Sequence, residues 1–175
     1  MIATPDDSPT ECGSFDDLLA ANRAYARSHQ LAGFDGVAHA GVAMVTCMDS
    51  RIDPLRMIGL SAGDAKILRN PGGRVTDQAI MGLVLSVNLL GVDRILVVQH
   101  TRCAMASQTE QELRARLTET SGHDASWLRL DVIADQVASI TADVAKAREH
   151  PLISSSVEIG GFLYDVDTGL LSTVV

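Results

Sequence analysis

Short apolar runs bounded by polar turns recur along the chain and predict strands. Residues 41–46 read G-V-A-M-V-T, residues 65–68 read A-K-I-L and residues 94–99 read R-I-L-V-V-Q. Short, largely apolar runs of this kind are typical of strands that are covered on both faces. Near the end of the chain, E-I-G-G-F-L-Y-D-V-D-T-G-L-L-S-T-V-V predicts two further strands joined by a turn at D-T-G.

Longer segments with apolar residues three or four positions apart predict helices between these strands. The first, over residues 14–29, opens with a serine as its N-cap. The second follows a threonine cap at Thr76 and stops at Gly91. Its apolar face comprises Ile80, Leu83, Val84, Val87 and Leu90. Two more helices are expected at about residues 108–118 and 130–149.

This alternation of strands and helices predicts an α/β fold with a mostly parallel central sheet flanked by helices. A length of 175 residues suits one hydrophobic core. We therefore expect a single domain over residues 14–175, preceded by a disordered segment, residues 1–13, which is polar and contains two prolines. Loops that carry function are expected at the carboxyl ends of the strands.

Composition and charge narrow the class of protein. Hydrophobic residues make up 46% of the chain, but no run approaches the roughly 18 apolar residues that a membrane helix needs. The net charge of −8 argues against nucleic acid and anionic lipid as partners. The start of the chain has neither the basic region nor the apolar region of a secretory signal, so we expect a cytoplasmic location.

Cysteine and histidine residues at two predicted strand ends suggest a metal site. Cys47 follows the first strand, and His100 and Cys103 follow the strand at residues 94–99. Singly, a buried cysteine or a histidine after a strand is commonly structural. Together the three would supply two thiolates and one imidazole from adjacent strand ends. Three protein ligands with an open position are typical of catalytic zinc.

An acidic and a basic residue lie next to the first of these cysteines, in C-M-D-S-R. Arg51 can clamp the Asp49 carboxylate through two parallel hydrogen bonds, which would orient it and keep it ionised. Such a pair can be a surface salt bridge only. Its position beside a candidate thiolate ligand favours a functional interpretation, in which Asp49 faces the metal.

Three motifs, C-M-D-S-R, R-N-P-G-G-R-V-T-D and H-T-R-C, occur here in the order and at the separations of the β-class carbonic anhydrases. The chain resembles in particular their compact bacterial clade, over about residues 15–165. The resemblance implies zinc held by Cys47, His100 and Cys103, with water or hydroxide as the fourth ligand. It also implies a zinc lyase in which the metal-bound hydroxide attacks CO2 to give bicarbonate, assembled as a homodimer.

The resemblance also assigns roles to residues around the metal. Asp49, paired with Arg51, would accept a hydrogen bond from the zinc-bound hydroxide. Some family members have a closed state in which this aspartate replaces the water. The backbone of Gly72 and Gly73 would approach a small linear substrate closely, because neither residue has a Cβ. A tight turn without a ligand is the alternative interpretation of these glycines, and the two are compatible.

Two departures from the family pattern flank Cys103. Members commonly read H-T-D-C-G-M where this chain reads H-T-R-C-A-M. Arg102 could stabilise the thiolates, retain anions or point outward. Ala104 would cost about 1 kcal/mol if the usual glycine has a positive φ, and nothing if that glycine begins a helix. We expect zinc binding to be retained and turnover to need measurement.

Two alternative functions remain open at this point. The same scaffold could hydrolyse carbonyl sulfide or carbon disulfide, which are linear relatives of CO2. It could also be a zinc-binding module without turnover, although the intact pair of Asp49 and Arg51 argues against that.

Overall fold

The computed structural model describes residues 15–175 of the chain. Its contacts divide the chain into two units, Met1–Phe34 and Asp35–Val175, and each is described here by itself. The predicted disorder of residues 1–13 lies outside the described residues. The prediction of one domain over residues 14–175 stays a prediction.

The described part of the first unit contains one helix, α1 (Asp16–Ala26). Phe15 occupies its N-cap position, and Ser14, the predicted cap, lies outside the described residues. Two aspartates in the first turn are favourable at the positive end of the helix dipole. No residue of α1 is buried within the chain; the exposed large side chains at this end are Phe15, Leu18, Leu19 and Tyr25.

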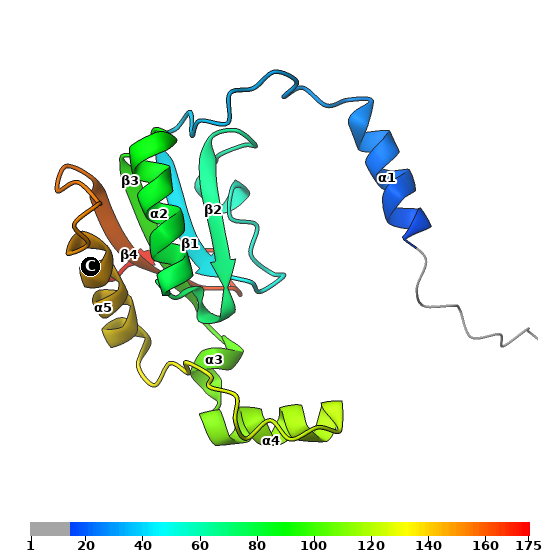
Figure 1. Cartoon of the computed structure of the whole chain (residues 1–175), viewed down its shortest axis with the longest axis vertical. Helices are drawn as coiled ribbons and strands as arrows, with labels where there is room; N and C mark the ends of the chain where they lie inside the picture. Colours follow the sequence, from blue (N-terminus) through cyan, green and yellow to red (C-terminus); the bar gives the residue numbers. More distant parts are fainter. Residues whose placement is uncertain (1–14) are drawn as a thin grey trace, which may run out of the picture. The chain divides into compact units, whose positions relative to one another are not determined.

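The second unit is built on a five-stranded sheet of order β2-β1-β3-β4-β5. Its strands are β1 (Val42–Cys47), β2 (Ala65–Asn70), β3 (Arg94–His100), β4 (Glu158–Tyr164) and β5 (Leu171–Thr173). The first four are parallel and β5 is antiparallel to β4, as Figure 1 shows in part. This confirms the predicted α/β class with a mostly parallel sheet. Cys47 and His100 are the last residues of β1 and β3, so both lie at carboxyl strand ends as predicted.

Two helices, α2 (Asp77–Leu89) and α5 (Gln136–Arg148), supply the rest of the main hydrophobic core. The predicted cap Thr76 is confirmed, because its side chain accepts a hydrogen bond from the Ala79 N–H at 3.2 Å. Buried side chains of both helices pack on alternate positions of the central strands, and therefore on one face of the sheet. The shared core includes Ala43, Val45, Ile95, Val97, Ile159, Leu83, Ile140 and Val144.

The prediction that the last helix starts near residue 130 is wrong. The helix begins at Gln136 because Asp135 caps it, accepting a hydrogen bond from the Ala138 N–H at 3.0 Å. The preceding segment is held outside the helix, since the Ile133 N–H donates to the Met105 carbonyl at 2.7 Å. No sequence pattern marked that long-range bond.

Smaller elements surround the ends of the strands. The helix expected at residues 108–118 is α4 (Glu110–Ser121), which begins with a complete capping box at Thr109. Two short elements were not predicted, α3 (Ala104–Ser107) and the 3₁₀ turn η1 (Arg56–Ile58), whereas the 3₁₀ turn η2 (Pro71–Gly73) lies where proline and two glycines predict a turn. They close the loops around the candidate site described next.

None of the described helices could cross a membrane. The longest, α2 and α5, have 13 residues each, whereas a span needs about 20.

Candidate metal centre

The sulfur and imidazole groups predicted from the sequence converge at one edge of the sheet. Because β1 and β3 are parallel neighbours, their last residues, Cys47 and His100, meet at the same edge. A turn through Thr101 and Arg102 returns Cys103 to them as the N-cap residue of α3. The ligand atoms of all three side chains lie within 4.8 Å of one another, and all three are buried.

The His100 ring is oriented to offer one nitrogen. Its Nδ1 lies 2.8 Å from the Thr101 carbonyl oxygen. A carbonyl only accepts, so Nδ1 carries the proton and Nε2 presents a lone pair. Nε2 is fully buried and has no hydrogen-bond partner of normal geometry among the described residues. A buried nitrogen without a partner is unfavourable unless a further group binds it, and a metal ion would do so.

The Cys47 sulfur lies in surroundings that favour a thiolate. The Cys103 thiol is 4.0 Å away and can donate to it, and the backbone N–H groups of Asp49 and Gly72 also point to it. These donors lower the pKa of Cys47 to about 4, against the opposing effect of burial. Burial, the largest single influence on His100, acts against its charged form, but the Cys47 thiolate, the Thr101 carbonyl and the Asp49 carboxylate together raise the pKa of His100.

Cys103 holds the proton of this sulfur pair when no metal is bound. Its hydrogen bond to Cys47, followed by burial, raises the pKa of Cys103. Backbone N–H groups of Met105 and Ala106, in the first turn of α3, oppose that rise. The same N–H groups would stabilise a second thiolate once a cation replaced the shared proton. Two soft thiolates and one imidazole form a donor set that suits zinc.

Asp49 and Arg51 form the two-point pair that the sequence suggested. Arg51 Nε donates to Asp49 Oδ1 at 2.9 Å, and Arg51 Nη2 donates to Oδ2 at 2.7 Å. This bonding lowers the pKa of Asp49 well below its usual range, although partial burial acts against it. Asp49 Oδ2 lies 3.8 Å from His100 Nε2. A fixed carboxylate therefore stands beside the unpartnered nitrogen.

The two glycines of the η2 turn have steric reasons to be glycine. Gly73 has a φ of +65°, and a Cβ there would lie 2.5 Å from the Val98 carbonyl oxygen and 3.0 Å from the Cys47 nitrogen. Gly72 has a φ of +79°, and its Cβ would meet Ile133 at 2.9 Å. This geometry supports the tight-turn interpretation, with Gly72 also directing its N–H to the Cys47 sulfur.

Arg102 and Ala104 have different conformations. Arg102 has a φ of +55° and is the one non-glycine residue with a positive φ among residues 15–175. Ala104 begins α3 with ordinary helical geometry, so the interpretation in which it costs nothing is the one the structure supports. The exposed Arg102 side chain pairs with Asp167, with Nη2 and Oδ1 2.8 Å apart.

Several hydrogen bonds that support the site were not predicted from the sequence, although Arg69 was expected to hold the adjoining loop. Arg69 donates from β2 to the carbonyls of Cys47 and Asp49, at 2.9 and 2.6 Å. Gln136 donates from the start of α5 to the His100 carbonyl at 2.9 Å. The Thr101 hydroxyl accepts from the Val166 N–H at 3.1 Å. These are long-range bonds to backbone groups, which leave no local pattern in a sequence.

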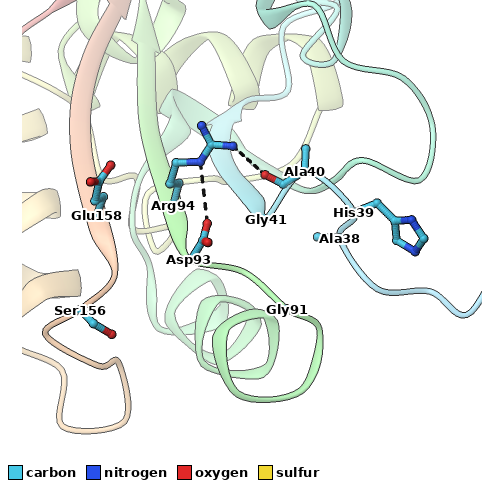
Figure 2. Close-up of a pocket in the computed structure, with 9 residues that line it drawn as sticks. All are labelled: Ala38, His39, Ala40, Gly41, Gly91, Asp93, Arg94, Ser156 and Glu158. Carbon is cyan, nitrogen blue, oxygen red and sulfur yellow. Dashed lines mark hydrogen bonds and ion pairs between the residues drawn. The ribbon is translucent and has the colours of Figure 1, made fainter.

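A separate hollow lies at the amino ends of the strands, where Ala40, Asp93, Arg94 and Glu158 line it (Figure 2). Two of its charged groups, Asp93 and Arg94, already interact with each other. Arg94 donates to the Ala40 carbonyl at 2.7 Å and lies 3.7 Å from Asp93. The hollow holds no buried side chain that lacks a partner among the described residues. Among residues 15–175, the group of side chains suited to metal binding lies at the opposite, carboxyl edge of the sheet.

Comparisons with a family model, with curated relatives and with solved structures all point to the same family. A family model described as carbonic anhydrase matches residues 42–154. Beta-carbonic anhydrase 1 of Mycobacterium tuberculosis is 32% identical over 163 residues, which cover 91% of this chain and 96% of that protein. The chain belongs to the β-carbonic anhydrase family. A solved carbonic anhydrase from Streptococcus mutans has 38% identity and a TM-score of 0.84, and the match covers 95% of this chain and all of that one.

Membership of the β-carbonic anhydrase family confirms the predicted family, the fold class and the enzyme class. The family also has relatives with another name: a carbon disulfide hydrolase of Acidithiobacillus thiooxidans is 32% identical over 146 residues. That match covers 71% of this chain and 72% of the relative, less than the match to the mycobacterial β-carbonic anhydrase.

Proposed function

We propose that the protein is a zinc-dependent carbonic anhydrase that interconverts CO2 and bicarbonate, with zinc held by Cys47, His100 and Cys103. One observation carries this proposal: two sulfurs and an otherwise unpartnered imidazole nitrogen converge within 4.8 Å in a buried position. When bound, zinc supplies Lewis-acid activation of water, so that a nucleophile is available near neutral pH.

The chain's own residues would position that nucleophile. Asp49 is held ionised by Arg51 and stands 3.8 Å from His100 Nε2, so it can accept a hydrogen bond from a water molecule at the site. Accepting that bond fixes the direction in which the oxygen lone pair points toward CO2. The backbone of Gly72 and Gly73 would lie against a small linear substrate at the sulfurs, because the absence of a Cβ lets the η2 turn pack closely on β1 and β3 and direct the Gly72 N–H to Cys47.

The direct test is stopped-flow CO2 hydration between about pH 6.5 and 9, with rates expressed per bound zinc. We expect a zinc-dependent rate that rises with pH. Asp49→Asn should retain zinc and lose most of the rate, on the order of 10²-fold, because an amide cannot replace the charged acceptor. Asp53→Asn is the matched control, since Asp53 belongs to an exposed pair with Arg56.

Two other results would redirect the assignment. If protein purified under reducing conditions contained no zinc, the metal site itself would be contradicted. Full zinc occupancy without CO2 hydration would contradict the carbonic anhydrase activity. Assays with carbon disulfide and carbonyl sulfide would then separate a hydrolase of these substrates from a zinc-binding module without turnover. We favour CO2 because the similarity to the mycobacterial β-carbonic anhydrase extends over more of both chains.

We further infer a homodimer from two exposed apolar helix faces. On α1, Leu18 and Leu19 are 61% and 52% exposed. On α2, Met81, Leu85 and Leu89 follow one another at intervals of four residues and are 47–69% exposed. Contact with a second copy of the chain would cover such faces.

A cytoplasmic location agrees with the free thiols of Cys47 and Cys103, which a reducing compartment preserves.

A further inference from the structure

Arg102 holds a strained position between two candidate metal ligands. It follows His100 by two residues and precedes Cys103, and its φ of +55° is unfavourable for a residue with a side chain. Its carbonyl oxygen accepts a hydrogen bond from Arg51 Nη2 at 3.3 Å. Its guanidinium lies 2.8 Å from Asp167 Oδ1, in the turn between β4 and β5. Arg102 therefore connects that turn to the Arg51 side chain.

Arg51 has two carboxylates within electrostatic reach. Asp49 is its two-point partner. Asp167 lies 2.8 Å from the guanidinium of Arg102, the residue whose carbonyl accepts from Arg51 Nη2, and its charge also raises the pKa of Arg51. Asp167 is at present occupied by Arg102. If that positive charge were absent, Asp167 would attract Arg51 away from Asp49. Asp49 would then lose the partner that holds it 3.8 Å from His100 Nε2.

The turn that carries Asp167 is itself fixed against the site. The Asp167 N–H donates to Asp165 Oδ1 at 2.9 Å, and the Thr101 hydroxyl lies 3.4 Å from the same oxygen. The Thr101 N–H donates to the Tyr164 carbonyl at 2.9 Å. Asp167 is therefore held close to the segment that carries His100 by contacts that do not involve the Arg102 side chain.

We propose that Arg102 is a positioning residue that occupies Asp167 and thereby keeps Arg51 paired with Asp49. This inference rests on the proposed function, because the Asp49 carboxylate is the group whose placement it explains. It answers the question raised by the H-T-R-C sequence: the arginine acts neither on the sulfurs nor as an isolated surface charge, but on the second carboxylate near Arg51.

The proposal predicts an asymmetry between the two members of the ion pair. Arg102→Ala leaves Asp167 uncompensated and is expected to lower CO2 hydration about threefold, in the range known for exposed pairs. Asp167→Ala removes the competing carboxylate, so Arg51 keeps Asp49 and the rate stays near that of the parent protein. The double variant should likewise recover the parent rate. Arg102→Lys, which keeps the positive charge, should retain most of it.

A second measurement follows Asp49 without using turnover. In cobalt-substituted protein, the visible absorption spectrum reports the ligands around the metal. We expect Arg102→Ala to change this spectrum, because Asp49 is released toward the metal position, and we expect Asp167→Ala and the double variant to match the parent. Arg129→Ala, at an exposed arginine paired with Asp131, is the control for loss of a surface charge.

The outcomes separate this proposal from the proposed function. Equal losses in both single variants, without recovery in the double variant, would show that the pair only braces the loop and would overturn the proposal. An unchanged cobalt spectrum in Arg102→Ala would also overturn it. If the parent protein binds zinc but does not hydrate CO2, the carbonic anhydrase assignment fails, and the spectra still decide the role of Arg102.

Discussion

Single residues around the sulfur pair determine how this site takes up a metal. Cys47 is already ionised near neutral pH, because Cys103 donates to it, whereas Cys103 retains its proton. The positions of both cysteines could be predicted from the sequence, because each follows a predicted strand. Their unequal protonation could not, since it depends on a distance of 4.0 Å between sulfurs that are far apart in the sequence.

We predict that zinc uptake releases on the order of one proton from Cys103, because zinc needs both sulfurs as thiolates. Affinity should consequently rise about tenfold per pH unit above pH 7 and weaken as pH falls, most steeply below about pH 4, where Cys47 also becomes protonated. Calorimetry in two buffers of different ionisation enthalpy measures the number of protons released per zinc ion bound.

Cys103→Ser should bind zinc more weakly and lose this proton release. If the parent protein released no proton on zinc uptake at pH 8, the proposed sharing of one proton between Cys47 and Cys103 would be contradicted. His100 contributes an additional fraction at lower pH, because its pKa is also raised.

At the scale of elements, the η2 turn brings β1, β3 and α5 into one arrangement. Gly73 packs against the backbones of β1 and β3, and Arg74 next to it pairs with the buried Asp143 of α5. The sequence predicted a turn at R-N-P-G-G, because proline and two glycines demand one. It did not predict which backbones the turn touches, because those belong to strands 25 or more positions away along the chain.

Gly73→Ala is expected to destabilise the protein by about 2–4 kcal/mol, from the positive φ and from displacement of two backbones. Zinc content should fall as well, because Cys47 is one of the displaced residues. Gly122→Ala is the matched control: its φ is +70°, but a Cβ there meets nothing within 4 Å. We expect it to cost about 1 kcal/mol. If urea denaturation gave equal losses of unfolding free energy for Gly73→Ala and Gly122→Ala, the close approach of Gly73 to the backbones of β1 and β3 would be unimportant for stability.

Asp143→Ala is expected to cost about 2–4 kcal/mol of unfolding free energy. Asp143 is buried and accepts hydrogen bonds from Arg74 Nε at 2.7 Å and from the Val75 N–H at 3.1 Å. Its removal leaves a partly buried guanidinium without a partner. Asp53→Ala, in an exposed pair with 3.9 Å between Arg56 Nε and Asp53 Oδ2, should change stability by less than about 1 kcal/mol. Urea denaturation of both variants tests this difference.

Helix boundaries show where local patterns stop being informative. Thr76 was predicted correctly as a cap because the signal is local: a threonine precedes an apolar periodic segment. The start of α5 was predicted six residues too early, because residues 130–135 have helix-compatible side chains but their backbone bonds to α3. The start of α5 is therefore determined by a hydrogen bond to a distant part of the chain, the Met105 carbonyl in α3, and not by the local pattern.

At the scale of the whole molecule, the exposed faces of α1 and α2 lead to a prediction about assembly. We expect a dimer by light scattering at micromolar concentration. Replacing both Leu18 and Leu19 with Glu should shift the protein toward monomer, because burying two carboxylates against an apolar partner is unfavourable. Asn22→Glu, also exposed on α1, is the control and should leave the dimer intact. A monomeric parent protein would contradict the prediction.

The placement of the candidate ligands on two strands has a consequence for biosynthesis. Cys47 leaves the ribosome 56 residues before Cys103, and translation at roughly 5–20 residues per second separates them by about 3–11 s. During that interval Cys47 has neither the other two candidate ligands, His100 and Cys103, nor the pairing of β1 with β3. A nascent chain therefore presents an unprotected thiol to oxidants and stray metal ions, and the set of three candidate ligands is complete only after Cys103 has been synthesised and β3 has paired with β1.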